Sequence, residues 1–111
     1  MLIEQGDLCW LDFDPSAGHE PRKRRPALVI STGEFNNVYS SLTFVCPITS
    51  TVSMHPFHIP MPADMSVQGM ICVEQAAALD PATRHLEPTG EYLDKQTMGI
   101  VLEVFASFFG L

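Results

Sequence analysis

Four consecutive basic residues form the chemically most distinctive segment of this sequence. The chain carries six Lys and Arg against thirteen Asp and Glu, a formal net charge of −7, yet four of the six cations adjoin one another as Arg22, Lys23, Arg24 and Arg25. A guanidinium donates two parallel hydrogen bonds to phosphate oxygens, a geometry that Lys cannot match. The run therefore predicts a localised anion-binding loop on an acidic protein, with an ordinary solvated patch as the alternative.

Arg25 is the strongest single candidate in this run. Pro26 follows it and restricts the backbone where the charged segment gives way to the apolar stretch "PALVIS". We therefore expect the guanidinium to be held at a fixed place, between a loop and a strand. A solvated loop arginine is the alternative.

Cysteine and histidine, the other residue types that could do chemistry, show no spacing typical of a metal site. The three cysteines are widely separated, and each lies in an apolar, strand-like stretch: Cys9, Cys46 and Cys72. We expect buried, reduced thiols rather than a disulfide framework or zinc ligands. His55, His58 and His85 likewise have no mutual spacing that suggests metal ligation. We interpret them as surface or core residues.

Length and composition predict one globular domain spanning residues 1–111. The hydrophobic content of 46% and the charged fraction of 17% are typical of a packed core rather than a disordered chain. The first four residues include Glu4 where a secretory signal would carry basic residues, and no apolar run approaches a membrane span. We expect a cytoplasmic protein that does not bind membranes.

Short apolar segments predict the elements that must position these side chains. Residues 8–14 alternate like a half-buried strand, residues 26–31 are rich in β-branched side chains, and residues 42–49 form a continuous apolar run typical of a sheet centre. Pro47 within the last run indicates a strand end, a bulge or an edge. Two further strands are predicted at 57–61 and at 69–79.

The connecting segments and the C-terminus do not show strand patterns. Residues 15–25 combine Gly, Pro and charge and predict an exposed, mobile loop, and residues 34–41 predict a turn. From Asp94 as N-cap, apolar residues follow at helical spacing. That stripe comprises Met98, Val101, Leu102, Phe105, Phe108 and Phe109. We expect it to pack on its own sheet, with a dimer contact as the alternative use.

The fold class that follows is mainly β with a C-terminal helix. Five or more short strands and one amphipathic helix predict a small, strongly bent antiparallel sheet or barrel, with the helix laid against it.

Four motifs in order along the chain resemble those of the MazF/PemK toxins, which include the Kid branch. They are "GDLCWLDFDPSAGHE", "RRPALVIS", "VCPITS" and "GMICVEQAAALD". The resemblance implies an SH3-like barrel of about five to seven antiparallel strands, acting as a homodimer. It also implies a sequence-selective endoribonuclease that cleaves single-stranded RNA without a metal or other cofactor. The resemblance further implies a MazE-like antitoxin partner that blocks the RNA groove and confers DNA binding on the complex.

The resemblance also assigns roles to four residues. Arg25 and Thr49 correspond to the family's catalytic arginine and active-site hydroxyl, which would hold the phosphate. His19 and Glu74 are similar to residues assigned to proton transfer in the Kid branch. RNA cleavage needs a base for the 2′-hydroxyl, an acid for the leaving 5′-oxygen and positive charge for the phosphorane, so these residue types suit it. The expected products carry a 2′,3′-cyclic phosphate and a 5′-hydroxyl.

Five residues are candidates for binding RNA outside the catalytic centre. Arg22, Lys23 and Arg24 would contact phosphates without reading sequence. Gln75 and the 51–58 loop, with Phe57 for stacking, would contribute to pockets for splayed bases.

One departure from the family pattern leaves a rival open. The Kid branch has a catalytic arginine two places before the acidic residue, and this chain has Cys72 there. Arg25 could act alone, or Arg84 or a loop cation could substitute. The rival is a non-catalytic module on the same fold, either a gyrase poison resembling CcdB or an RNA binder that has lost cleavage.

Overall fold

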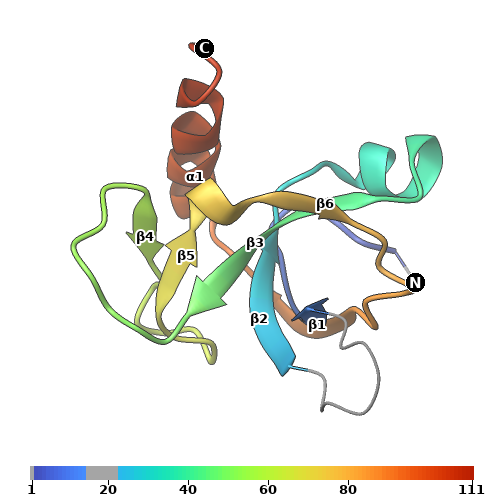
Figure 1. Cartoon of the computed structure of the whole chain (residues 1–111), viewed down its shortest axis with the longest axis horizontal. Helices are drawn as coiled ribbons and strands as arrows, with labels where there is room; N and C mark the ends of the chain where they lie inside the picture. The colour runs from blue at the N-terminus through green and yellow to red at the C-terminus, as the bar shows by residue number, and fades with distance from the viewer. Residues whose placement is uncertain (1, 15–22) are drawn as a thin grey trace.

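The computed structural model describes residues 2–14 and 23–111. Seven strands in this part of the chain are joined in one bent sheet, and α1 stands against one end of it (Figure 1). The strands are β1 (Asp7–Asp14), β2 (Lys23–Val29), β3 (Thr43–Thr49), β4 (His58–Pro60), β5 (Met70–Cys72), β6 (Ala77–Leu79) and β7 (Glu87–Tyr92). The helical segments are η1 (Phe35–Tyr39), η2 (Val73–Gln75) and α1 (Lys95–Ser107).

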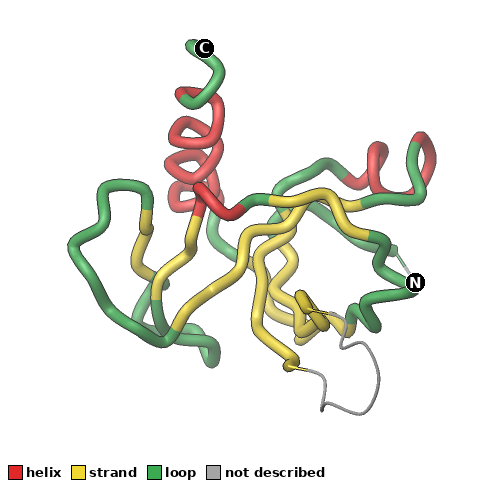
Figure 2. Tube along the Cα trace, in the orientation of Figure 1, coloured by secondary structure: helices red, strands yellow, loops and turns green. Residues whose placement is uncertain are grey.

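The strand order confirms the predicted mainly antiparallel architecture. Neighbours run β4-β5-β3-β2-β1-β7, with β6 paired to β3, and every pairing is antiparallel. Among the described strands, β4 and β7 at the two ends of this order do not pair, so the bent sheet is not closed by hydrogen bonds. Figure 2 shows the strands as one strongly curved sheet with α1 beside it.

The central strands are buried on both faces, as their continuous apolar character predicts. Leu8 and Leu28 belong to the core cluster beneath α1, whereas their neighbours Cys9 and Ala27 belong to a second cluster on the other face. This division follows from the two-residue period of a strand.

β3 changes its outer partner halfway along. Thr43 to Val45 pair with β6, whereas Ile48 and Thr49 pair with β5. Pro47 lies between these two stretches, in the interior of the strand and not at its end. The loss of a backbone donor is tolerated there because the outer ladder is interrupted at that point.

The segment 69–79, predicted as one strand, is two strands separated by a corner. η2 turns the chain after Cys72, so that β5 pairs with one end of β3 and β6 with the other. The corner places Glu74 and Gln75 beside the end of β3, a placement that a continuous strand would not give.

Two other segments differ from prediction. Residues 34–41 contain the π-helical turn η1, in which the Asn36 and Asn37 amides donate to the Ile3 carbonyl at 3.1 and 2.8 Å. β7 was not predicted, because Pro88 and Gly90 are uncommon in strands; β7 pairs only with β1 among the described strands, and such an edge tolerates both.

The C-terminal helix is confirmed with Asp94 as its N-cap. The Asp94 carboxylate accepts a hydrogen bond from the Thr97 amide at 2.8 Å. Met98 and Val101 are buried in the cluster beneath the helix, which confirms packing on its own sheet, while Phe109 beyond the helix end is 67% exposed. Within the described ranges, no helix combines the length and apolarity that crossing a bilayer requires.

The cap makes helix stability depend on pH. Hydrogen bonds from the Thr97 backbone and side chain lower the pKa of Asp94 from 3.8, so its stabilising effect is present above the unfolded-state pKa and is lost as the pH falls through the folded one. Asp94→Ala should lower the melting temperature at pH 7, and the deficit should shrink at pH 3 in thermal unfolding followed by circular dichroism. Asp94→Asn, which keeps an acceptor without the charge, should retain a cap at both pH values.

Candidate active site

Strand pairing brings Arg25 and Thr49 to the same place. β2 and β3 pair in the register Ala27 to Pro47, and extending it by two residues sets Arg25 opposite Thr49. Directly opposed residues on antiparallel strands have side chains on one face and within contact range. The two residues line the same two cavities, as the sequence predicts for a common cleft.

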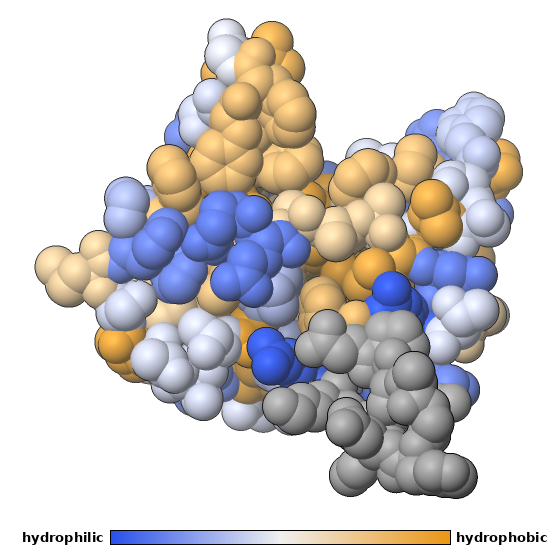
Figure 3. Space-filling model, viewed as in Figure 1, coloured by the Kyte–Doolittle hydropathy of each residue, from blue (hydrophilic) through white to orange (hydrophobic). Residues whose placement is uncertain are grey.

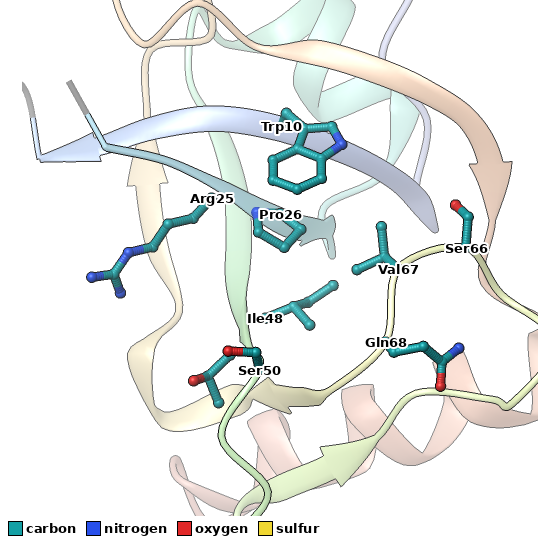
Figure 4. A pocket seen from close by; sticks show the side chains of 9 residues that line it. Trp10, Arg25, Pro26, Ile48, Ser50, Ser66, Val67 and Gln68 are labelled. Atoms are coloured by element: carbon teal, nitrogen blue, oxygen red, sulfur yellow. The ribbon is translucent and has the colours of Figure 1, made fainter. Parts of the chain in front are cut away.

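The larger cavity has a volume of about 740 Å³ and lies over Trp10 and Pro26. Figure 4 shows Trp10, Pro26, Ile48 and Val67 along its wall, with the Arg25 guanidinium directed away from the tryptophan. Polar groups of Ser50, Ser66 and Gln68 complete the lining. We call it the Trp10 cavity.

The smaller cavity, of about 180 Å³, lies on the side to which Arg25 reaches. It is lined by Arg25, Pro47, Ile48, Thr49, Thr51, Ser53, His58, Cys72 and Gln75, and we call it the His58 cavity. The register explains this set: Cys72 pairs with His58, and the β3–β5 ladder extended by one residue sets Cys72 opposite Pro47. One face of four neighbouring strands thus carries the cavity.

Thr49 and Arg25 differ in their polar contacts within this cavity. Thr49 Oγ1 accepts a hydrogen bond from the Thr51 amide at 3.2 Å, which orients the hydroxyl at the strand end. No group within residues 2–14 and 23–111 donates to, accepts from or forms an ion pair with the exposed Arg25 guanidinium. The guanidinium is therefore available to an anion from solution.

Glu74 lines neither cavity, and its carboxylate contacts two histidines. Its Oε2 is 2.9 Å from His58 Nε2 and 3.5 Å from His55 Nε2, and the two imidazoles stack with centroids 4.2 Å apart. His55 is an exposed surface residue and His58 is mostly buried, as interpreted from the sequence, and the structure adds their shared contact with Glu74. Figure 3 shows a hydrophilic patch over the β4–β5 end of the sheet, below the apolar surface of α1.

Donor atoms of His55, His58 and Glu74 lie within 4.8 Å of one another, as in a metal site. The Phe57 amide, however, donates to His55 Nδ1 at 3.2 Å, so the single proton of a neutral His55 is on Nε2, directed at Glu74. A ring in that tautomer offers no lone pair to a metal at the cluster centre. Glu74 thus forms a hydrogen bond with His58 and an ion-pair contact with His55, and the two rings stack.

The two other arginines that the structure describes have internal partners. Arg24 contacts the buried Asp12 carboxylate at 3.3 Å and donates to the His85 carbonyl at 2.9 Å. Arg84 donates to the carbonyls of Asp12 and Phe13. Arg84 and Arg24 thus both use guanidinium donors within the fold, and the 35% exposed Arg24 side chain stays a predicted phosphate contact.

The remaining predicted residues lie in different parts of the chain. His19 and Arg22 lie outside the described residues, and Lys23 begins β2. Gln75 lines the His58 cavity. Phe57 lies at the outer edge, 38% exposed, with its ring 4.9 Å from Phe108 in an edge-on contact.

Sequence reasoning missed His58 and Trp10 as site residues. The signal for His58 was its place at the start of a predicted strand, but only the ladder to Cys72 shows that it faces the cavity. Trp10 was interpreted as a bulky member of an alternating strand, whereas it is 41% exposed at the wall of the larger cavity.

The cysteines are buried and reduced, as predicted. Burial raises the pKa of both Cys9 and Cys46 to about 12, so neither is a nucleophile near neutral pH. Burial also raises the pKa of Cys72, which keeps a neutral thiol where the Kid branch has a cation.

Gly69 should be required for the placement of Thr49. A Cβ there would lie 2.1 Å from the Thr49 carbonyl oxygen, and φ is +125°. Gly69→Ala is expected to lower the free energy of unfolding by about 1–3 kcal/mol and to shift the Thr49 amide resonance, measured by urea denaturation and NMR. Gly99→Ala, on α1 with open space around it, should instead stabilise by roughly 0.5–1 kcal/mol. A neutral Gly69→Ala change would contradict the packing argument.

Comparisons with known proteins show which family the chain is similar to. The chain is 33% identical over 98 residues to the endoribonuclease toxin ChpB of Escherichia coli K12, covering 84% of this chain and 83% of that protein. It is 38% identical over 56 residues to the E. coli K12 endoribonuclease toxin MazF, half of each chain. The crystal structure of MazE–MazF (form III) from Deinococcus radiodurans superposes with a TM-score of 0.89 at 32% identity, covering all of this chain and 99% of that one. The model of PemK-like, MazF-like toxins of type II toxin–antitoxin systems matches residues 4–109, and the chain belongs to this family.

Proposed function

We propose that this chain is the toxin of a type II toxin–antitoxin system and cleaves single-stranded RNA at selected sequences without a metal. The observation that carries the proposal is the shared cleft of Arg25 and Thr49, in a chain similar to named endoribonuclease toxins. The products would carry a 2′,3′-cyclic phosphate and a 5′-hydroxyl, because the ribose 2′-hydroxyl is the nucleophile.

The cleft supplies what this reaction needs at phosphorus. A scissile phosphate in the His58 cavity would meet the Arg25 guanidinium, which has no competing partner among the described residues, and the oriented Thr49 hydroxyl. Both groups would stabilise the extra charge of the phosphorane. Glu74, one hydrogen bond from the cavity wall through His58, would belong to the proton-transfer machinery, and His19 remains a proposed participant.

Base selection would take place beside the phosphate site. The Trp10 cavity combines an exposed indole for stacking with the Gln68 and Ser66 side chains, and Gln75 is available in the His58 cavity. Arg22 and Lys23 would add phosphate contacts that confer salt dependence. Phe57 would stack on a flanking base.

We further propose a cytoplasmic homodimer silenced by a MazE-like antitoxin. An apolar groove of about 320 Å³ beside α1, lined by Ile30, Phe44, Leu102, Phe105 and Phe109, offers unburied surface to a second copy. An acidic antitoxin segment would pair with Arg25 and block the cleft, and the complex would bind DNA through the antitoxin.

One observation, the neutral Cys72 thiol in the cavity wall, favours a second function without RNA cleavage. A gyrase poison similar to CcdB, or an RNA binder without activity, would not need a cation there. Arg25, which has no polar partner among the described residues, lies beside Thr49 and favours the enzyme, because a gyrase poison has no use for phosphate-directed groups at that place.

Cleavage of a long single-stranded RNA in EDTA tests the proposal. Wild type should cut at defined sites, and Arg25→Ala and Thr49→Ala should each lower the cleavage rate by about 100-fold or more, measured by primer extension. Arg25→Lys should be intermediate because it keeps the charge but loses the paired donors. Lys95→Ala, at the start of α1 and outside both cavities, should cut like wild type. Intact RNA together with trapped gyrase–DNA complexes would favour the poison instead.

A further inference from the structure

The Glu74–His58 pair has a geometry that the family likeness does not explain. Glu74, the expected proton-transfer group, lines neither of the two cavities that contain Arg25 and Thr49, whereas His58 lines the smaller one. Of the two groups, only the imidazole lines the cavity in which a ribose hydroxyl would lie. We propose that His58 is the general base of the cleavage reaction and that Glu74 positions it. This inference rests on the proposed ribonuclease function.

The hydrogen bonds of His58 prepare one nitrogen for this role. Nε2 lies 2.9 Å from Glu74 Oε2, and since a carboxylate only accepts, Nε2 carries the proton. Nδ1 of a neutral His58 then keeps its lone pair. The Ser53 hydroxyl lies 3.3 Å from Nδ1 and lines the same cavity. A hydroxyl therefore already occupies the position that a substrate 2′-hydroxyl would take.

Burial and packing hold the imidazole in this orientation. The His58 side chain is only 12% exposed, its backbone pairs with Cys72, and His55 stacks on its outer face. An orienting carboxylate that stays ionised selects the tautomer and stabilises the imidazolium as it forms. The charged and titratable groups facing His58 are Glu74 on η2, His55 on the 51–57 loop, Arg25 on β2 and Cys72 on β5.

The resulting step balances in atoms and electrons. Nδ1 takes the 2′-hydroxyl proton, the oxygen's electron pair forms the O2′–P bond, and the P–O5′ bond breaks with its pair kept on the 5′-oxygen. Water protonates that oxygen, and the imidazolium returns its proton to the hydroxide left behind. Arg25 and Thr49 hold the phosphorane meanwhile. The neutral Cys72 is then acceptable, because no step requires a cation at its position.

Steady-state cleavage of a short RNA carrying one mapped site tests this role. His58→Gln should lower kcat by about 100-fold or more with little change in KM, because a base acts only in the transition state. Wild-type kcat should rise with pH between about 5 and 8, where histidines change charge, and this rise should disappear in His58→Gln. His55→Gln is the matched control: it also loses an imidazole in contact with Glu74, but His55 lines neither cavity, so the kcat of this variant should still rise with pH across this range.

Glu74→Gln separates a positioning role from a structural one. It keeps an acceptor for Nε2–H but removes the negative charge beside the ring, so the acid limb of the kcat profile should move to lower pH. A Glu74 that only supports the fold would leave this limb in place. The same variant decides the question if His58→Gln and His58→Asn both fail to fold by circular dichroism.

The outcomes distinguish this inference from the function on which it rests. If wild type cuts and Arg25→Ala does not, while folded His58→Gln keeps both rate and pH profile, the general-base role is wrong and the ribonuclease stands. If wild-type protein leaves RNA intact in EDTA, the proposed function itself fails.

Discussion

Antiparallel pairing of β2 with β3 is the constraint on which the site depends. The ladder from Ala27–Pro47 to Val29–Val45 is buried on both faces, and slipping it by one residue would move every apolar side chain of β2 to the wrong face. The core therefore fixes the register, and the register fixes Arg25 opposite Thr49. Hydrophobic packing at one end of the strands thereby positions the Arg25 and Thr49 side chains at the other end.

The corner at η2 extends this arrangement to the proton-transfer groups. The chain turns after Cys72, so β5 pairs with the end of β3 at Thr49. Glu74 lies in the turn, outside the strands, and its carboxylate contacts His58. Val73 within the corner is fully buried in the cluster beneath α1, which anchors the turn. The C-terminal helix thus supports the site without contributing a lining residue to either cavity that contains Arg25.

Local sequence pattern predicted the parts of this structure that local rules determine. The alternation of β1, the apolar run of β3 and the cap and stripe of α1 are short-range signals, and all three elements formed. The segment 69–79 was mistaken for one strand because residues on either side of η2 have similar strand propensity. Only the long-range pairing with two ends of β3 separates them. His58 was not predicted as a site residue for the same reason: its partner Glu74 is sixteen residues away in the sequence, and no spacing rule connects the two.

The buried carboxylate of Asp12 explains why, among the described arginines, Arg25 is left for an external anion. Asp12 is 2% exposed, and a buried carboxylate is costly unless cations and donors surround it. Arg24 and His85 meet that requirement from adjacent parts of the fold. Because neighbouring residues on a strand point to opposite faces, satisfying Asp12 with Arg24 directs Arg25 the other way, toward Thr49 and away from carboxylates that would neutralise it. A consecutive pair of arginines can thus give one stabilising residue and one accessible charge. The four-residue basic run is therefore not a uniform patch: its last two members are separated by the pleat of β2.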